Sequence, residues 1–136
     1  MTRTPRRILV IENDAAVRQF LLDLLSEEGH RVETVASLRA ARVLLQGWQP
    51  DLLVTDLSPW TTNLDDLPAL FAAEERLRGL PVVVCTAALA VTPDKLPPHL
   101  PGLELIRKPF NVEELLVAIE RLAARRGDPQ PGGGAD

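Results

Sequence analysis

The chain has 136 residues, of which 46% are hydrophobic and 25% are charged, and its formal net charge is −4. These values are typical of one folded domain and exclude a disordered chain, which would be poorer in hydrophobic residues. The single cysteine excludes a disulfide scaffold, and no apolar run reaches the ~18 residues of a membrane span. The acidic balance argues against direct nucleic-acid binding, and the lack of a signal peptide favours a cytoplasmic protein.

Strand and helix patterns alternate along most of the chain. Short apolar runs predict five strands, at residues 8–11, 32–35, 52–55, 82–85 and 103–106. Helices are expected to begin after residue types that cap N-termini, namely Asp14, Ser37, Asp65 or Asp66, and Asn111. The first of these helices is expected to end at Gly29, the second at Gln46 and the third at about Arg78. Buried strands that alternate with helices predict an α/β fold, a parallel sheet covered on both faces.

One segment interrupts this alternation between the fourth and fifth predicted strands. Residues 93–101 carry four prolines, and a proline inside a helix removes a hydrogen bond and clashes with the preceding turn. We therefore predict that the fourth helix is replaced by an extended or turn-rich crossing, with at most one helical turn near residues 87–90 or 93–96. The sequence leaves the conformation of residues 91–102 open.

The two ends of the chain differ in composition from its middle. Residues 1–5 are predicted to form an N-terminal tail, and residues 127–136, rich in glycine and proline, a disordered C-terminal tail. The domain is therefore expected to span residues 6–126. This length leaves no room for a separate DNA-binding domain, so we expect signalling by protein contacts.

Polar residues follow the carboxyl ends of the predicted strands. They are Glu12, Asn13 and Asp14 after the first strand, Asp56 after the third, Thr86 after the fourth and Lys108 after the fifth. Because ligands bind beyond the carboxyl ends of parallel strands, we expect these side chains to share one pocket. Clustered carboxylates favour Mg²⁺, and a carboxylate beside such an ion can attack a phosphoryl group. A lysine and a hydroxyl can neutralise the phosphoryl oxygens, which makes the central Asp56 the expected acceptor.

Four segments, residues 8–14, 51–56, 82–87 and 108–110, together resemble the receiver domain of two-component response regulators. The resemblance extends over about residues 6 to 125. It implies a flavodoxin-like (CheY-like) doubly wound fold, with five parallel strands in the order 2-1-3-4-5.

The same resemblance implies a function and its residues. A sensor histidine kinase or phosphotransfer protein would donate a phosphoryl group to Asp56. Mg²⁺ would be held by Glu12, Asn13 and Asp56, and the phosphoryl oxygens would contact Thr86 and Lys108. The domain would then signal to an output protein or to a second copy of itself, as a homodimer, and would not be an enzyme.

The sequence departs from the family pattern at several positions. Asn13 stands where a carboxylate usually binds the metal, so Mg²⁺ is expected to bind more weakly unless Asp14 turns inward. The aromatic switch position of the family is occupied by Leu105, which has no ring or hydroxyl. The loop at 57–65 lacks the usual methionine-proline pair.

These departures leave an alternative open. The chain would then be a pseudo-receiver, a constitutive interaction or dimerisation module that needs no phosphorylation. A third reading, a metal-dependent phosphatase, is disfavoured because no second aspartate lies two residues after Asp56 to act as acid and base.

Some other residues have simpler explanations. Cys85 lies in an apolar run and is expected to be buried. His30 and His99 have no metal-ligand spacing and are expected at the surface. Trp60 either covers the pocket or, as the simpler interpretation, packs on a neighbouring side chain. The arginines near the N-terminus, among them Arg7, are expected to be solvated.

Overall fold

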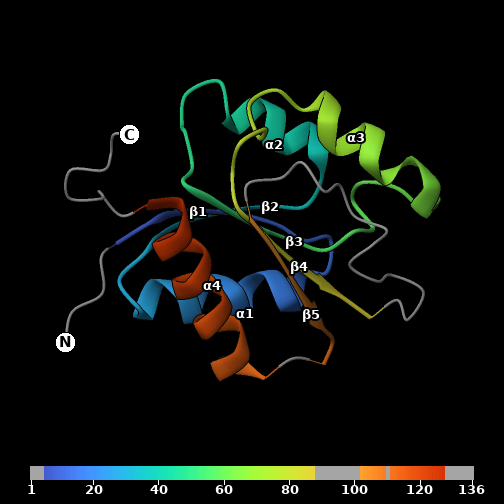
Figure 1. Ribbon diagram of the computed structural model, residues 1–136. Coiled ribbons are helices and arrows are strands. Elements are labelled where there is room, and N and C mark those ends of the chain that lie inside the picture. The colour runs from blue at the N-terminus through green and yellow to red at the C-terminus, as the bar shows by residue number, and fades with distance from the viewer. Residues whose placement is uncertain (1–4, 88–101, 110, 128–136) are drawn as a thin grey trace.

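The protein forms a three-layer α/β sandwich around one parallel sheet. The computed structural model describes residues 5–87, 102–109 and 111–127. The strands are β1 (Arg7–Ile11), β2 (Arg31–Val35), β3 (Leu52–Thr55), β4 (Val82–Thr86) and β5 (Leu103–Arg107). They pair in parallel in the order β2-β1-β3-β4-β5 (Figure 1). The predicted fold class and strand order are thus confirmed.

Helices cover both faces of the sheet. Helices α1 (Ala15–Glu27) and α4 (Val112–Gly127) lie on one face, and α2 (Leu38–Leu44) and α3 (Leu67–Ala73) lie on the other (Figure 1). Each pair buries its own apolar cluster against the sheet. Leu21 and Ile119 belong to the cluster under α1 and α4, and Ala41 and Phe71 belong to the cluster under α2 and α3. Because the central strands are covered on both sides, β1, β3 and β4 are runs of apolar residues.

Three predicted helix caps are present. The Asp14 carboxylate accepts hydrogen bonds from backbone N–H groups in the first turn of α1, at 2.9 and 3.1 Å. The Ser37 hydroxyl accepts one from Ala40 at 3.1 Å, and the Asn111 side chain accepts one from Glu113 at 2.7 Å. These bonds satisfy N–H groups that have no partner inside the helix.

The prediction for α3 was right at its start, where Asp66 holds the N-cap position, and wrong at its end, which comes before Arg78. A 3-10 turn, η1 (Leu64–Asp66), precedes the helix, and the Asp66 side chain makes no capping hydrogen bond. The helix ends at Ala73, where Glu74 leaves the helical backbone with φ −89° and ψ 88°. Two interactions explain the early end. The Glu74 carboxylate is bound by Arg42 of α2 at 3.0 Å, and the chain beyond it turns to bury Leu77 in the core.

His30 is buried and not at the surface, contrary to the prediction. It is only 6% exposed, at the start of β2, and its Nδ1 accepts a hydrogen bond from the backbone N–H of Arg6 at 3.1 Å. A long-range contact across 24 residues therefore satisfies this ring nitrogen, and no local sequence pattern indicates such a contact.

Several predictions concern segments outside the described residues. Nearly all of the proline-disrupted crossing at 91–102 lies there, as do residues 1–4 and 128–136 of the two predicted tails. Helix α4 includes Gly127, so it extends one residue into the predicted C-terminal tail. Among the described helices, none combines the length and hydrophobicity needed to span a membrane.

Candidate functional site

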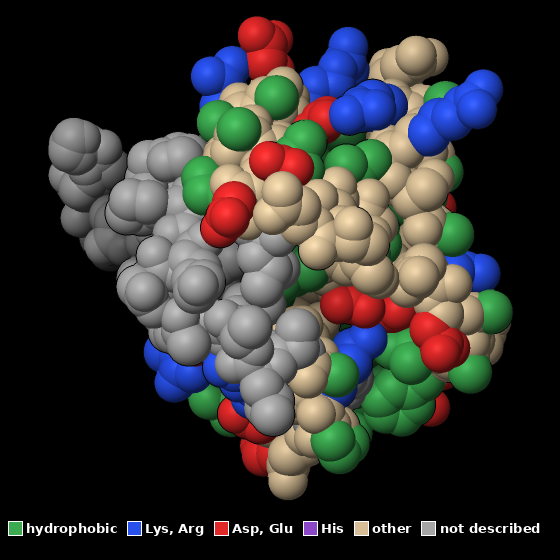
Figure 2. All heavy atoms as spheres, turned by 90° about the vertical axis from the view of Figure 1, so that its right-hand side faces the viewer, with side chains coloured by type: hydrophobic (Ala, Val, Ile, Leu, Met, Phe, Trp, Pro, Cys, Tyr) green, Lys and Arg blue, Asp and Glu red, His purple; other side chains and the backbone are tan. Residues whose placement is uncertain are grey.

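Three charged side chains meet at the carboxyl edge of the sheet. Glu12 follows β1, Asp56 follows β3 and Lys108 follows β5. The ammonium Nζ of Lys108 lies 2.8 Å from Oε1 of Glu12 and 3.2 Å from Oδ2 of Asp56. Figure 2, which faces this edge, shows acidic side chains beside a basic side chain in a hollow of the surface. The sheet therefore brings together residues that are up to 96 positions apart in the sequence.

Glu12 is the most deeply buried of these charges. It is 1% exposed, and its two carboxylate oxygens have separate partners. Oε1 accepts from Lys108, and Oε2 accepts from the backbone N–H of Asp14 at 3.0 Å. A buried carboxylate is tolerated only when it is paired in this way. Glu12 thus anchors the lysine from below the site.

Lys108 is held as a cation between the two carboxylates. Burial lowers the pKa of its ammonium, but the hydrogen bond to Glu12 and the charge of Asp56 outweigh burial and raise the pKa above its ordinary value. The Lys108 backbone N–H also donates to the carbonyl of Thr86 at 2.8 Å. The position of the ammonium is therefore fixed by both its main chain and its side chain.

Asp56 is the more accessible carboxylate, with its side chain 17% exposed. Its backbone N–H donates to the carbonyl of Ile11 at 3.1 Å, and its Oδ1 accepts from the backbone N–H of Leu57 at 2.6 Å. Oδ2 faces Lys108. These contacts orient the carboxylate toward the hollow.

A buried tryptophan supports the strand that carries Asp56. The indole Nε1 of Trp60 donates to the Thr55 hydroxyl at 3.0 Å, and that hydroxyl lies 3.1 Å from the Ile11 carbonyl oxygen, to which it donates. The Trp60 ring packs on Phe71 of α3, with ring centroids 4.3 Å apart. Trp60 is 6% exposed, so the simpler interpretation, packing on a neighbour, is confirmed. The loop after β3 is thereby tied both to the sheet and to α3.

Asn13 and Ser58 lie on the open side of Asp56. The Ser58 hydroxyl donates to Oδ1 of Asn13 at 3.1 Å and lies 3.4 Å from Oδ2 of Asp56. The carbonyl oxygen of Asn13 and the carboxylate of Asp56 therefore border one small space. Asp14 does not turn toward it, because its carboxylate caps α1 and is exposed.

A cavity of about 420 Å³ adjoins Asp56. It is lined by Asp56, Lys108 and four hydroxyl residues, Ser58, Thr61, Thr62 and Thr86. Thr86 is the last residue of β4 and is buried. The predictions included Thr86 but missed the three hydroxyls of the loop. Their clustering directly after Asp56 in the sequence was the available signal.

Leu105 lies away from this cavity. It belongs to β5, pairs with Val84 of β4 and packs, partly buried, against the apolar cluster under α2 and α3. An aliphatic side chain thus occupies the position where the family resemblance implies an aromatic switch.

The oxygen atoms near Asp56 suit a hard divalent cation. They carry less negative charge than a site in which every ligand is a carboxylate. Asp56 and Glu12 supply carboxylate oxygens, and Asn13 supplies a neutral carbonyl oxygen. Within the described residues no group of three acidic, histidine or cysteine side chains could hold a metal ion. The reduced charge follows directly from the asparagine.

A parallel sheet with a partly exposed carboxylate, a fixed lysine and hydroxyl residues at its carboxyl edge is the arrangement that the family resemblance implies. Comparison with known families assigns the chain more narrowly. The response regulator receiver domain matches residues 8–120, and the chain belongs to this family of two-component signalling proteins. The resemblance seen in the sequence is thereby confirmed.

Individual proteins agree with this assignment. The transcriptional regulatory protein TcrA of Mycobacterium tuberculosis is 32% identical over 126 residues, which cover 92% of this chain and 49% of TcrA. The response regulator MprA of Mycolicibacterium vanbaalenii is 34% identical, with 96% of this chain and 55% of MprA covered. The chain thus spans about half the length of these curated relatives.

A solved structure shows the same fold. The receiver domain of the sensor histidine kinase PA1611 from Pseudomonas aeruginosa superposes with a TM-score of 0.69 and 20% identity, over 89% of this chain and 99% of that one. That structure has a magnesium ion coordinated in its active-site cleft. Nothing in these comparisons supports the phosphorylation-independent alternative.

Proposed function

We propose that Asp56 accepts a phosphoryl group from the phosphohistidine of a sensor kinase or phosphotransfer protein. The observation that supports this most is the position of Asp56, beside Lys108 and at the wall of a hydroxyl-lined cavity. A carboxylate oxygen of Asp56 attacks phosphorus and forms an acyl phosphate. The bond between phosphorus and the donor imidazole breaks, and its electron pair stays on the imidazole nitrogen, which takes up a proton.

The neighbouring residues act by position and charge. Lys108 leaves its ion pair with Asp56 and neutralises an oxygen of the transferred group, while Glu12 continues to hold the ammonium. The hydroxyls of Thr86 and Ser58 donate to other phosphoryl oxygens in the cavity. The domain is a stoichiometric acceptor in this account and has no turnover of its own.

The residues at this site fit Mg²⁺, with one negative charge fewer than a site that has a carboxylate at position 13. Glu12, Asn13 and Asp56 would hold the ion, and it would supply charge neutralisation for the phosphoryl oxygens. Because Asn13 contributes no charge, we propose that the affinity for Mg²⁺ is lower than in a site with a carboxylate at this position.

An apolar groove on this domain offers the donor protein a surface on which to dock. A groove of about 320 Å³ beside the site is lined by Ala16, Val17 and Phe20 of α1 together with Lys108 and Pro109. Phe20 is 45% exposed, which is unusual for so large an apolar side chain. A donor helix seated in this groove would bring its histidine next to Lys108.

The output of the domain is proposed to be a protein contact. Receiver domains communicate with histidine kinases and with output domains, and the curated relatives include transcriptional regulators about twice as long as this chain. We infer that the phosphorylated domain acts on an output protein or on a second copy of itself, in the cytoplasm. Direct contact with nucleic acid is not proposed, since the net charge of the chain is −4.

Intact-mass spectrometry after incubation with Mg²⁺ and acetyl phosphate tests the acceptor. The unmodified sequence should gain one phosphoryl group, and Asp56→Asn should gain none. Asp51→Asn is the matched control, because Asp51 is exposed at the opposite end of β3 and should not affect uptake. If the folded protein gains nothing from acetyl phosphate or from a phosphorylated histidine phosphotransfer protein, the proposal fails and the pseudo-receiver alternative stands.

A further inference from the structure

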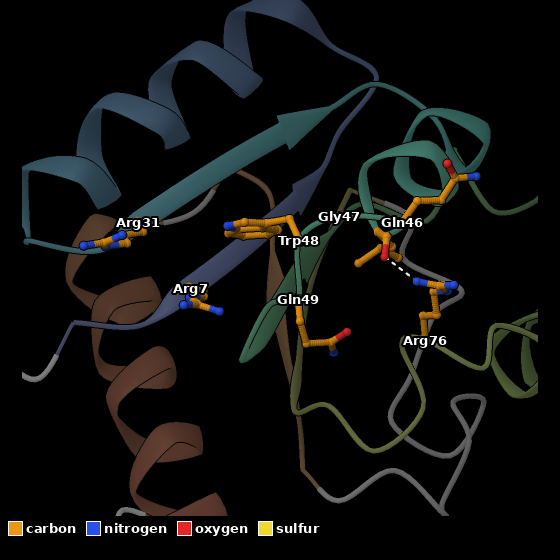
Figure 3. Close-up of a pocket in the computed structure, with 8 residues that line it drawn as sticks. Arg7, Arg31, Gln46, Gly47, Trp48, Gln49 and Arg76 are labelled. Carbon is orange, nitrogen blue, oxygen red and sulfur yellow. Dashed lines mark hydrogen bonds between the residues drawn. The ribbon is translucent and has the colours of Figure 1, made fainter.

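A second cavity, of about 580 Å³, opens at the amino edge of the sheet, opposite the Asp56 site (Figure 3). Arg7 begins β1 and Arg31 begins β2, while Trp48 lies in the connection between α2 and β3. Arg76, which follows α3, closes the cavity from the other side, and its guanidinium donates to the carbonyl of Leu45. The volume is in the range of small-molecule sites, about 300–1,000 Å³.

The charge of this cavity is its most unusual property. Among the described residues, three arginines and no carboxylate line it, although the chain as a whole has a net charge of −4. Arg7 and Arg31 are register partners on neighbouring strands, and like charges in that arrangement repel. Asp51 is close in the sequence to the cavity, but its carboxylate accepts from the backbone N–H of Arg7 at 2.9 Å. Among the described residues, no acidic side chain forms an ion pair with the guanidinium of Arg7 or Arg31.

Aromatic and amide groups complete the lining. Trp48 is half-buried, and its ring extends from the chain toward the side of the cavity where Arg31 lies (Figure 3). Its exposed part offers a flat apolar surface within an otherwise polar cavity. The side-chain amide of Gln46 is exposed at the rim and can both donate and accept hydrogen bonds.

We propose that this cavity binds a nucleotide. Its phosphates would lie between Arg7 and Arg31, because guanidinium groups bind phosphate oxygens in pairs and cancel the repulsion between the two side chains. Its base would stack on the exposed face of Trp48, as bases stack on aromatic side chains in other proteins. A bare anion would use only the arginines, whereas a nucleotide also uses the exposed part of Trp48, whose remainder packs against the apolar cluster under α2 and α3.

Isothermal titration calorimetry with ADP, in EDTA so that no metal binds at the opposite edge, tests the proposal. We expect saturable binding that weakens about tenfold in Arg31→Gln and in Arg7→Gln, since each loses charge-assisted hydrogen bonds. Arg39→Gln is the matched control, because Arg39 is exposed on α2 outside the cavity and its loss should leave binding unchanged. Circular dichroism establishes that each variant is folded.

Two further readouts locate the ligand. ADP should quench tryptophan fluorescence, and Trp48→Phe should abolish the quenching but retain calorimetric binding, since a phenyl ring can still stack. Inorganic phosphate and adenosine should each bind more weakly than ADP. The proposal is overturned if ADP does not bind at roughly millimolar concentration, if Arg7→Gln and Arg31→Gln bind like Arg39→Gln, or if phosphate alone binds as tightly as ADP.

Discussion

The two edges of the sheet handle charge in opposite ways. At the carboxyl edge, Lys108 lies between Glu12 and Asp56, so each buried charge has a partner. At the amino edge, Arg7 and Arg31 are register partners, and no carboxylate of the described part of the chain lines the cavity beside them. At the first edge one ammonium is shared by two carboxylates, and in the proposed phosphotransfer Lys108 would exchange its ion pair with Asp56 for one with the phosphoryl group. The second edge carries two exposed arginines that form no ion pair with an acidic side chain among the described residues.

The strongest test of this contrast removes the cation at the carboxyl edge. Lys108→Met leaves the Glu12 carboxylate buried without its ion-pair partner, and should lower the free energy of unfolding by about 3 kcal/mol. Urea denaturation measures the loss. Adding Glu12→Gln should recover part of the stability, because an amide needs no counter-charge. A double variant no more stable than Lys108→Met would show that the pair is not coupled.

Removing the hydrogen bond that supports β3 beneath Asp56 should cause a smaller loss of stability. Trp60→Phe keeps an aromatic ring beside Phe71 but removes the donor to the buried Thr55 hydroxyl, and should cost about 1–2 kcal/mol of unfolding free energy. Trp48→Phe is the control at the other edge, since its indole N–H has no hydrogen-bond partner among the described residues. Equal losses of stability in the two variants would contradict the anchoring role of Trp60.

The buried thiol of β4 gives a pH-dependent test. Burial raises the pKa of Cys85 to about 12 in the folded protein. As the pH rises past the ordinary pKa of a thiol, Cys85 loses its proton in the unfolded chain but keeps it in the folded protein. The free energy of unfolding is therefore highest below that pKa and falls above it. By pH 10 the loss should be about 1.5–2 kcal/mol, measured by urea denaturation as the difference between the original protein and Cys85→Ala. The same pH dependence in both proteins would contradict the prediction.

The smallest effect should come from the amino edge, and with the opposite sign. Arg31→Gln removes a like-charge neighbour of Arg7 and should raise the unfolding free energy by about 0.3 kcal/mol at low salt without ligand. The gain should shrink in about 1 M salt, which screens the repulsion. Arg39→Gln, measured in parallel, should show no gain. Destabilisation by Arg31→Gln at low salt would mean that the arginines are not in conflict.

The sequence predicted those features that depend on local patterns. The five strands follow from apolar runs, and Asp14, Ser37 and Asn111 cap helices because their side chains reach N–H groups two or three residues away. The convergence of Glu12, Asp56 and Lys108 was predictable because parallel strands end at one edge.

The features that were missed depend on contacts between distant elements. The early end of α3 depends on Arg42, which is 32 residues before Glu74, and the burial of His30 depends on Arg6 across 24 residues. The cavity at the amino edge forms only when the loop that carries Trp48 lies over the starts of β1 and β2. No local period or short motif encodes such contacts.

The most direct test of the central claim is to locate the phosphoryl group. After phosphorylation, borohydride reduces an aspartyl phosphate to homoserine, and peptide sequencing by mass spectrometry identifies the changed position. We predict homoserine at position 56 and nowhere else, with none formed in Asp56→Asn. Homoserine at another aspartate, or an unmodified Asp56 in protein that has gained the mass of a phosphoryl group, would contradict the assignment of Asp56 as the acceptor.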